Sequence, residues 1–259
     1  MKRLTEFASQ VLLCHADDAE ALPNWFVSAR RSARFADVFA FDATEAPHDV
    51  ERLQREKRGF DLSRYLDRFY VCVRPHDTHR RQRILDILFD CAAPEYEQLI
   101  NPNQNRENIF QLLAALEAAC GPLAGKLVID FGCGVGLSKQ AAQEFGVRLV
   151  GFDRCPRMRK QANAHGLEVW GPRHLAVAPK NSIDAAFCSY LFHLLPDLGS
   201  LRLLWLRLRV GGALAANFHK GRGLDRVADA FGATASEHNI EGPQLMFAHG
   251  LYRLFIRSQ

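Results

Sequence analysis

The sequence predicts an α/β fold in residues 123–259, built on a mostly parallel sheet with helices on both faces, and a mainly helical region in residues 1–95. Two observations predict this division. From about Leu123 onward, short apolar runs alternate with helical patterns, which is typical of parallel strands joined by helices. Residues 1–95 show no such alternation, and residues 96–122 are expected to form a hinge and a leading helix.

The expected elements of the C-terminal part follow one another in a regular order. Runs rich in Val, Leu, Ile and Phe predict strands, and Gly146 and Gly166 mark the ends of amphipathic helical patterns. Pro156 suits the first turn of a helix, because a proline there removes no intrahelical hydrogen bond. The predicted strands span residues 126–132, 147–153, 167–170, 183–189, 212–218 and 251–258, and the predicted helices span 137–146, 156–166, 198–209 and 224–232.

The clearest element of the first 95 residues is a helix over residues 77–92, which Asp77 or Thr78 is suited to cap. Residues 34–44 and 68–75 are compatible with strands, and the sequence leaves their structure open. After them, a stretch rich in Pro and Asn indicates a hinge that leads into a helix over residues 107–120. The apolar stripe of the first helix consists of Ile84, Leu85, Leu88 and Phe89.

Composition limits the classes of protein to which the chain can belong. It has 259 residues, 48% of them hydrophobic, which is enough for a substantial core. No run of about 18 apolar residues is present, so we expect no membrane-spanning helix, and polar residues in the first apolar patch argue against a secretory signal. The seven cysteines are scattered without a CxxC pair, which predicts reduced thiols in a cytoplasmic protein and no metal site.

The charge of the chain is only mildly basic. A net charge of +4 permits an anionic ligand or nucleic acid but requires neither. Two basic clusters, residues 28–35 and 76–83, are expected to lie on solvated helix faces. The second cluster contains His76, Asp77 and His79, for which a helix cap with exposed histidines is favoured over a metal site.

The stretch "LVIDFGCGVG", residues 127–136, carries the strongest functional signal. Glycines directly after a strand let the backbone turn sharply and approach a ligand closely. A dinucleotide fingerprint needs a glycine where this chain has Leu137, and a Walker loop needs a Gly-Lys-Ser/Thr ending that the chain lacks. The remaining pattern is an acid followed by three alternating glycines, from Asp130 to Gly136.

This pattern resembles the first motif of class I S-adenosylmethionine (SAM) dependent methyltransferases, and three further features fall in the family's order. Asp153 closes the second strand, residues 182–197 resemble the family's fourth-strand segment, and residues 206–218 resemble its Gly-Gly turn and fifth strand. The resemblance covers roughly residues 123–220 and is greatest to small-molecule members, such as the methyltransferase-11/25-like domains. It implies a Rossmann-like sheet whose last strand is antiparallel.

The resemblance also implies a role for each residue of the donor site. Asp130 is expected near the methionine ammonium of SAM, Asp153 at the ribose hydroxyls, and Arg154 either beside the adenine or on the surface. The family usually has an acid after the third strand, where this chain reads "VWGPRHLAV", so adenine recognition is left to backbone groups or to nearby side chains. The expected cofactor-binding residues are Asp130, Gly132, Cys133, Gly134, Gly136, Asp153, Arg154 and Ser189.

Candidates for acceptor chemistry follow the fourth and fifth strands. His193 and His219 are the candidate catalytic bases, with a purely structural histidine as the alternative for each. Tyr96, Arg106 and Tyr190 are the candidate substrate or lid residues. The "(D/N/S)PP(Y/F)" tetrapeptide of nucleic-acid amine methyltransferases is replaced by "SYLF", which does not favour a nucleic acid as partner.

Together these features predict a cytoplasmic SAM-dependent methyltransferase that releases S-adenosylhomocysteine and methylates oxygen or nitrogen of a small molecule. The first 95 residues are expected to form a cap that selects the acceptor, and the sequence leaves room for a homodimer. A SAM-binding scaffold or regulatory protein without transferase activity is the main alternative, because binding does not establish turnover. A nucleotide-dependent oxidoreductase is disfavoured by Leu137.

Overall fold

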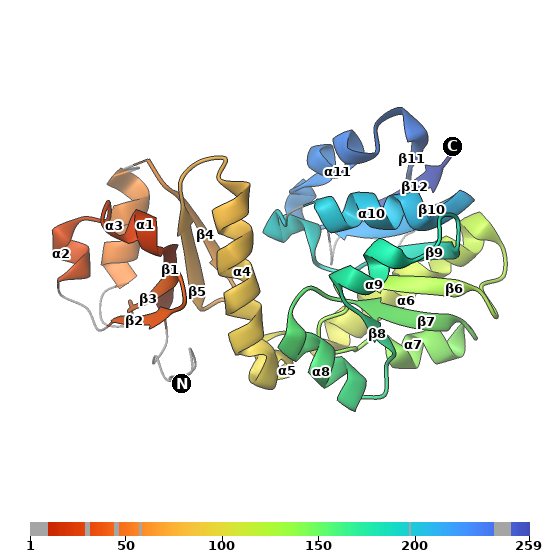
Figure 1. Ribbon diagram of the computed structural model, residues 1–259, viewed down its shortest axis with the longest axis horizontal. Coiled ribbons are helices and arrows are strands. Elements are labelled where there is room, and N and C mark those ends of the chain that lie inside the picture. The colour runs from red at the N-terminus through yellow and green to blue at the C-terminus, as the bar shows by residue number, and fades with distance from the viewer. Residues whose placement is uncertain (1–9, 29–31, 44–46, 57–58, 197, 241–249) are drawn as a thin grey trace. The chain divides into compact units, whose positions relative to one another are not determined.

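The computed structural model describes residues 10–28, 32–43, 47–56, 59–196, 198–240 and 250–259. The chain divides into two compact units, Met1–Ile100 and Asn101–Gln259 (Figure 1). Each unit has a sheet of its own. In the described ranges, no helix combines the length and the apolar character that crossing a membrane requires.

The N-terminal unit is built on a five-stranded mixed sheet in the order β2-β3-β1-β5-β4. The central strand β1 pairs in parallel with β5 and antiparallel with β3. The apolar side chains of α2 and α3 pack on the face that carries Leu12 and Cys14, whereas α4 contacts β1 and β5. The strands are β1 (Val11–His15), β2 (Ser32–Phe35), β3 (Val38–Asp42), β4 (Asp61–Tyr65) and β5 (Phe69–Val73), and the helices are α1 (Ala16–Ala19), α2 (Asn24–Val27), α3 (Pro47–Glu56), α4 (Thr78–Ala92) and α5 (Tyr96–Leu99).

The region predicted to be mainly helical thus also contains a five-stranded sheet, which the sequence did not predict. Strands β1 and β5 are buried on both faces, so their sequences are continuous apolar runs without the alternation that marks a half-exposed strand. Residues 34–44 and 68–75, whose structure the sequence left open, contain strands β3 and β5. The cap predicted for the helix over residues 77–92 is confirmed, since Asp77 Oδ1 accepts a hydrogen bond from the backbone N–H of Arg80 at 2.9 Å.

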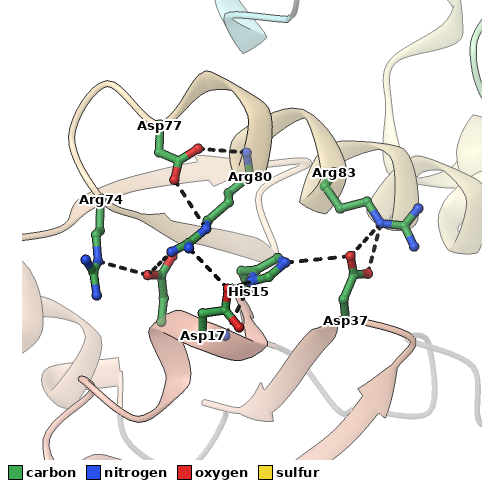
Figure 2. Close-up of polar contacts among 8 residues, drawn as sticks. His15, Asp17, Asp37, Arg74, Asp77, Arg80 and Arg83 are labelled. Atoms are coloured by element: carbon green, nitrogen blue, oxygen red, sulfur yellow. Dashed lines mark hydrogen bonds and ion pairs between the residues drawn. The ribbon is translucent and has the colours of Figure 1, made fainter.

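Ion pairs connect α4 to α1 and to the turn between β2 and β3 (Figure 2). The carboxylate of Asp18 is fully buried and pairs with Arg80 at 2.6 Å and with Arg74 at 3.0 Å. One turn further along the helix, Arg83 pairs with Asp37 at 2.9 Å, where both side chains are about two-fifths exposed. Part of the basic cluster 76–83 is thus used within the fold, and the Asp18 pairs are the ones shielded from water.

The C-terminal unit is built on a seven-stranded sheet in the order β11-β12-β10-β9-β6-β7-β8 (Figure 1). The pairs of β6 with β7 and β9, of β7 with β8 and of β9 with β10 are parallel, whereas β12 runs antiparallel to both β10 and β11. This arrangement confirms the predicted mostly parallel sheet with an antiparallel last strand. The strands are β6 (Leu127–Phe131), β7 (Arg148–Phe152), β8 (Val169–Trp170), β9 (Ile183–Cys188), β10 (Leu208–Phe218), β11 (Ala235–Asn239) and β12 (Leu251–Arg257).

Helices cover both faces of this sheet. One apolar cluster joins α9, α10 and α11 to the face that carries Ile129, and a second joins α6 and α7 to the face that carries Val128. The segment predicted as a turn-rich hinge is largely helical, because α6 begins at Pro102 and Asn101 caps it by accepting from the N–H of Gln104 at 3.1 Å. The helices are α6 (Pro102–Cys120), α7 (Lys139–Glu144), α8 (Pro156–Ala164), α9 (Pro172–Val177), α10 (Gly199–Arg207) and α11 (Leu224–Phe231).

Candidate functional site

The glycine-rich turn follows β6 and is attached to the end of β7. The backbone N–H groups of Gly132 and Cys133 both donate to the carbonyl oxygen of Phe152, at 2.8 and 3.0 Å. Gly132 has a φ of +86°, and a Cβ at this position would lie 2.9 Å from a side-chain carbon of Leu191. The turn therefore requires glycine here for its backbone conformation and for the space beside it.

Asp130 lies on β6, directly before the turn, and is buried. Burial raises its pKa to about 7; the Ser138 hydroxyl opposes this increase and the nearby Asp153 carboxylate adds to it. A positive charge beside Asp130 would offset both the burial and the repulsion between the two carboxylates. The site is therefore suited to a ligand that carries a cationic group.

Asp153 directly follows β7 and bridges the glycine turn and the start of α8. Its carboxylate accepts hydrogen bonds from the backbone N–H groups of Gly134, at 3.0 Å, and Cys155, at 2.8 Å. These charge-assisted bonds hold the carboxylate in place. An ionised carboxylate only accepts hydrogen bonds, so Asp153 offers negative charge and acceptor oxygens beside the glycine turn.

The two candidate bases lie close together at the carboxyl ends of neighbouring strands. His193 lies in the turn after β9 and His219 directly after β10, and their ring centroids are 5.7 Å apart. Burial, together with the positive charges of His219 and Arg222, lowers the pKa of His193 to about 4. Its Nδ1 atom is buried and has no hydrogen-bond partner in the part of the chain that the structure describes. His193 is therefore neutral at neutral pH, and a neutral imidazole has one ring nitrogen that can accept a proton.

Tyr190 completes this group, with its ring centroid 6.4 Å from that of His193. Burial raises the pKa of its phenol to about 12, and the negative charge of Glu107 contributes. The backbone has a φ of +51°, which is uncommon for a tyrosine, and its N–H donates to Asn217 Oδ1 at 2.8 Å. Strained backbone of this kind often occurs at functional sites.

Comparison with known proteins assigns the unit that carries this site. Residues 129–216 match the family model of the methyltransferase domain. The C-terminal unit carries a class I SAM-dependent methyltransferase domain. The ubiquinone biosynthesis O-methyltransferases of Xanthomonas oryzae pv. oryzae and of Xanthomonas campestris pv. campestris are each 33% identical, over 101 and 106 residues. These matches cover 36% and 38% of this chain but only 42% and 44% of the relatives, so the chain matches less than half of their length.

Solved structures share the fold of the methyltransferase domain. The magnesium protoporphyrin IX methyltransferase of Synechocystis, solved with bound SAM, superimposes with a TM-score of 0.51 at 18% identity, over 69% of this chain and 97% of that one. A protein from Methanococcus maripaludis described as a putative SAM-dependent methyltransferase gives a TM-score of 0.50 at 13% identity, over 66% and 94% of the two chains. At these identities the likeness concerns the fold alone.

SAM is the cofactor of such domains, and the residues of this site fit it. SAM carries an ammonium and a sulfonium group, and a positive charge beside the buried Asp130 and its neighbour Asp153 would stabilise their ionised forms. The glycine turn provides a backbone surface without side chains at Gly132 and Gly134, where a ligand can approach closely.

A buried polar network in the methyltransferase domain was missed by the sequence analysis. Asn108 on α6 donates to Ser189 Oγ at 2.7 Å and to Asn217 Oδ1 at 3.2 Å, and the Tyr252 hydroxyl donates to Asn108 Oδ1. Asn217 also holds the N–H of Tyr190, so the network connects α6 to the turn after β9. An asparagine inside the apolar runs "NIFQLL" and "ALAANF" was the available signal, because a buried amide needs partners.

The remaining candidates lie at separate places. Ser189, predicted to bind the cofactor, is bonded to α6, and Arg106 on that helix donates to Asn103 Oδ1 at 3.2 Å. Tyr96 belongs to the N-terminal unit, where its ring centroid lies 6.2 Å from that of Phe89. The proposed roles of Ser189, Tyr96 and Arg106, and of Arg154 at the start of the turn after β7, stay predictions.

Proposed function

We propose that the protein is a SAM-dependent methyltransferase that transfers a methyl group to oxygen or nitrogen of a small-molecule acceptor and releases S-adenosylhomocysteine. The observation that carries the proposal is the pair of carboxylates, Asp130 and Asp153, on either side of the glycine turn. The two histidines at the ends of β9 and β10 extend the same edge of the sheet, because ligands of open α/β sheets bind outside the carboxyl ends of the strands.

The donor half of the proposal assigns roles along the first two strands of the domain. SAM supplies an activated methyl group on its sulfonium. Asp130 would pair with the ammonium, Asp153 would accept from the ribose hydroxyls, and the backbone of Gly132, Cys133, Gly134 and Gly136 would line the ligand. The bonds that Asp153 receives from Gly134 and Cys155 support this role, because they fix the carboxylate before any ligand binds.

The acceptor half assigns His193 as the general base. A neutral imidazole with an unpartnered Nδ1 can accept the proton that an acceptor hydroxyl loses when its oxygen is methylated. His219, 5.7 Å away between ring centroids, is the second candidate base. Because the pKa of His193 is about 4, its neutral form dominates above pH 5. Turnover of His193→Gln is therefore expected to fall by roughly 10²–10⁴-fold at every pH from 5.5 to 8, with SAM affinity unchanged. Full turnover in this variant would remove the role.

Calorimetry with SAM, S-adenosylhomocysteine and NAD tests the proposed cofactor. We expect the first two to bind and NAD not to bind, and Asp153→Ala to lose affinity for both. Equal SAM affinity of Asp153→Ala and wild type would contradict the ribose role. Release of S-adenosylhomocysteine in the presence of a metabolite library then separates an enzyme from a SAM-binding protein without turnover.

We further propose that the N-terminal unit selects the acceptor, with Tyr96, Arg106 and Tyr190 as substrate or lid residues. This is supported by the separate core of that unit, which the donor site does not use. A cytoplasmic location is supported by the seven free cysteines, and homodimerisation can be measured by light scattering. Methyl release by the fragment Asn101–Gln259, at the full-length rate and with the same acceptors, would contradict a selecting role for the N-terminal unit.

A further inference from the structure

Arg159 on α8 closes the turn that carries Asp153. Its Nη1 atom donates to the carbonyl oxygens of Asp153, at 2.9 Å, and of Arg154, at 2.6 Å. A guanidinium has five N–H donors, and both of these hydrogen bonds start at Nη1. Among the residues that the structure describes, Nε and Nη2 donate no hydrogen bond, so both can donate to another acceptor. The hydrogen bonds of Nη1 thus fix the side chain, and Nε and Nη2 can donate to a ligand.

The same guanidinium lies against the backbone after β8. A Cβ at Gly171 would be 3.2 Å from Arg159 Cζ and 3.3 Å from Nε, so a larger residue at position 171 would displace the arginine. Gly171 has an ordinary extended backbone with a φ of −101°, so its glycine is explained by space rather than by conformation. Arg159 and Gly171 together form one surface at the end of β8.

The charge of Arg159 also acts on the glycine turn. Burial and the carboxylates of Asp153 and Asp130 raise the pKa of the Cys133 thiol, and Arg159 lowers it. One guanidinium thus influences the turns after β6, β7 and β8, which are neighbours in the sheet.

The position of this surface bears on how the base of a nucleoside is recognised. With a cationic head at Asp130 on β6 and a ribose at Asp153 after β7, the base extends towards β8. A carboxylate there would accept from the exocyclic amine of adenine, but the residues that follow β8 are Gly171, Pro172 and Arg173. Guanidinium donors instead match acceptors, namely the ring nitrogens of a purine.

We propose that Arg159 recognises the base of the methyl donor through a ring nitrogen, N3 or N7, and that the exocyclic amine of adenine is not read. This inference rests on the proposed function, because it takes a SAM-like nucleoside as the ligand. Hypoxanthine keeps N3 and N7 and replaces the amine by a carbonyl oxygen. The site should therefore accept an inosine analogue of the ligand.

Calorimetry on the full chain tests this with S-adenosylhomocysteine, S-inosylhomocysteine and the 3-deaza and 7-deaza analogues of S-adenosylhomocysteine. We expect wild type to bind the inosine analogue within fivefold of S-adenosylhomocysteine and to lose more than fivefold with one deaza analogue. Arg159→Met is expected to bind S-adenosylhomocysteine more than fivefold more weakly than wild type does. The variant should bind that deaza analogue with the same affinity as it binds S-adenosylhomocysteine. Arg157→Met, on an exposed position of the same helix, is the matched control and should bind all four ligands like wild type.

Three results would overturn the proposal. The first is that wild type binds the inosine analogue more than fivefold more weakly than S-adenosylhomocysteine. The second is that Arg159→Met binds S-adenosylhomocysteine as tightly as wild type does. The third is that the deaza analogues lose the same affinity, relative to S-adenosylhomocysteine, in wild type and in Arg159→Met. The last result would mean that Arg159 only supports the turn around Asp153. If Arg159→Met does not fold, the affinities of wild type for the four ligands alone decide whether the proposal holds. If wild type does not bind S-adenosylhomocysteine at all, the proposed function fails and this inference fails with it.

Discussion

Replacing Asp130 by asparagine tests the electrostatics of the donor site without any ligand. The folded protein holds the pKa of Asp130 at about 7, against an ordinary value of 3.8. Below pH 4 the carboxyl is protonated in both folded and unfolded chains, so it does not change stability. Between pH 4 and 7 the unfolded chain releases the proton while the folded chain keeps it, so stability falls as the pH rises. Above about pH 7 the carboxyl is ionised in both states, and this loss of stability is complete.

The magnitude follows from the difference between the two pKa values. About three pH units at 1.36 kcal/mol each correspond to roughly 4 kcal/mol of stability, an upper limit because the folded chain can relax around the charge. Asparagine has a similar shape and does not ionise. Asp130→Asn should therefore be more stable than wild type at pH 8 by up to about 4 kcal/mol, with a much smaller advantage at pH 4.5. It should also lose affinity for SAM.

The assay is urea-induced unfolding of the two proteins at several pH values from 4.5 to 8.5, without ligand. Asp184→Asn is the control, because Asp184 accepts from the Leu127 N–H at 2.9 Å and pairs with Arg209 at 3.3 Å on the same sheet. Removing this bonded carboxylate should destabilise the protein at neutral pH. A stability difference between wild type and Asp130→Asn that does not increase with pH would refute the reasoning.

Two further pairs of substitutions test the need for glycine at position 132 and the contribution of the ion pair at Asp18. Gly132→Ala should abolish SAM binding and destabilise the protein more than Gly211→Ala does. Both positions have positive φ, +86° and +78°, but of the two only Gly132 has neighbouring atoms within 4 Å of an added Cβ. If both variants lost the same stability in thermal unfolding and the same SAM affinity in calorimetry, the clash at Gly132 would be contradicted. Arg80→Met should cost less in urea unfolding than the roughly 3–5 kcal/mol of a fully broken buried pair, because Arg74 stays paired with the buried Asp18. It should still cost more than Arg83→Met, for which we expect under about 1 kcal/mol. Similar losses in these two variants would show that burial of the ion pair does not matter.

Much of the donor site was predictable because its parts are local in sequence. The glycine turn follows a strand without interruption, and an acid at the end of the next strand must lie beside it in a parallel sheet. The same rule applied to the following strands brought His193 and His219 to one edge. What the sequence did not reveal was the unpartnered Nδ1 of His193, because that depends on packing around the ring.

The sequence by itself determined the α/β class of residues 123–259 and the position of the glycine turn, since strand periodicity, glycines and acids are properties of short segments. Only the tertiary structure decided that the first hundred residues contain a sheet, because strands buried on both faces carry no alternation to recognise. It also decided the partners of Asn108 and Arg159. Asn217 lies 109 residues after Asn108. Gly171 follows β8, whereas the turn that Arg159 holds follows β7. Contacts of this kind arise from chain topology, which brings distant residues together.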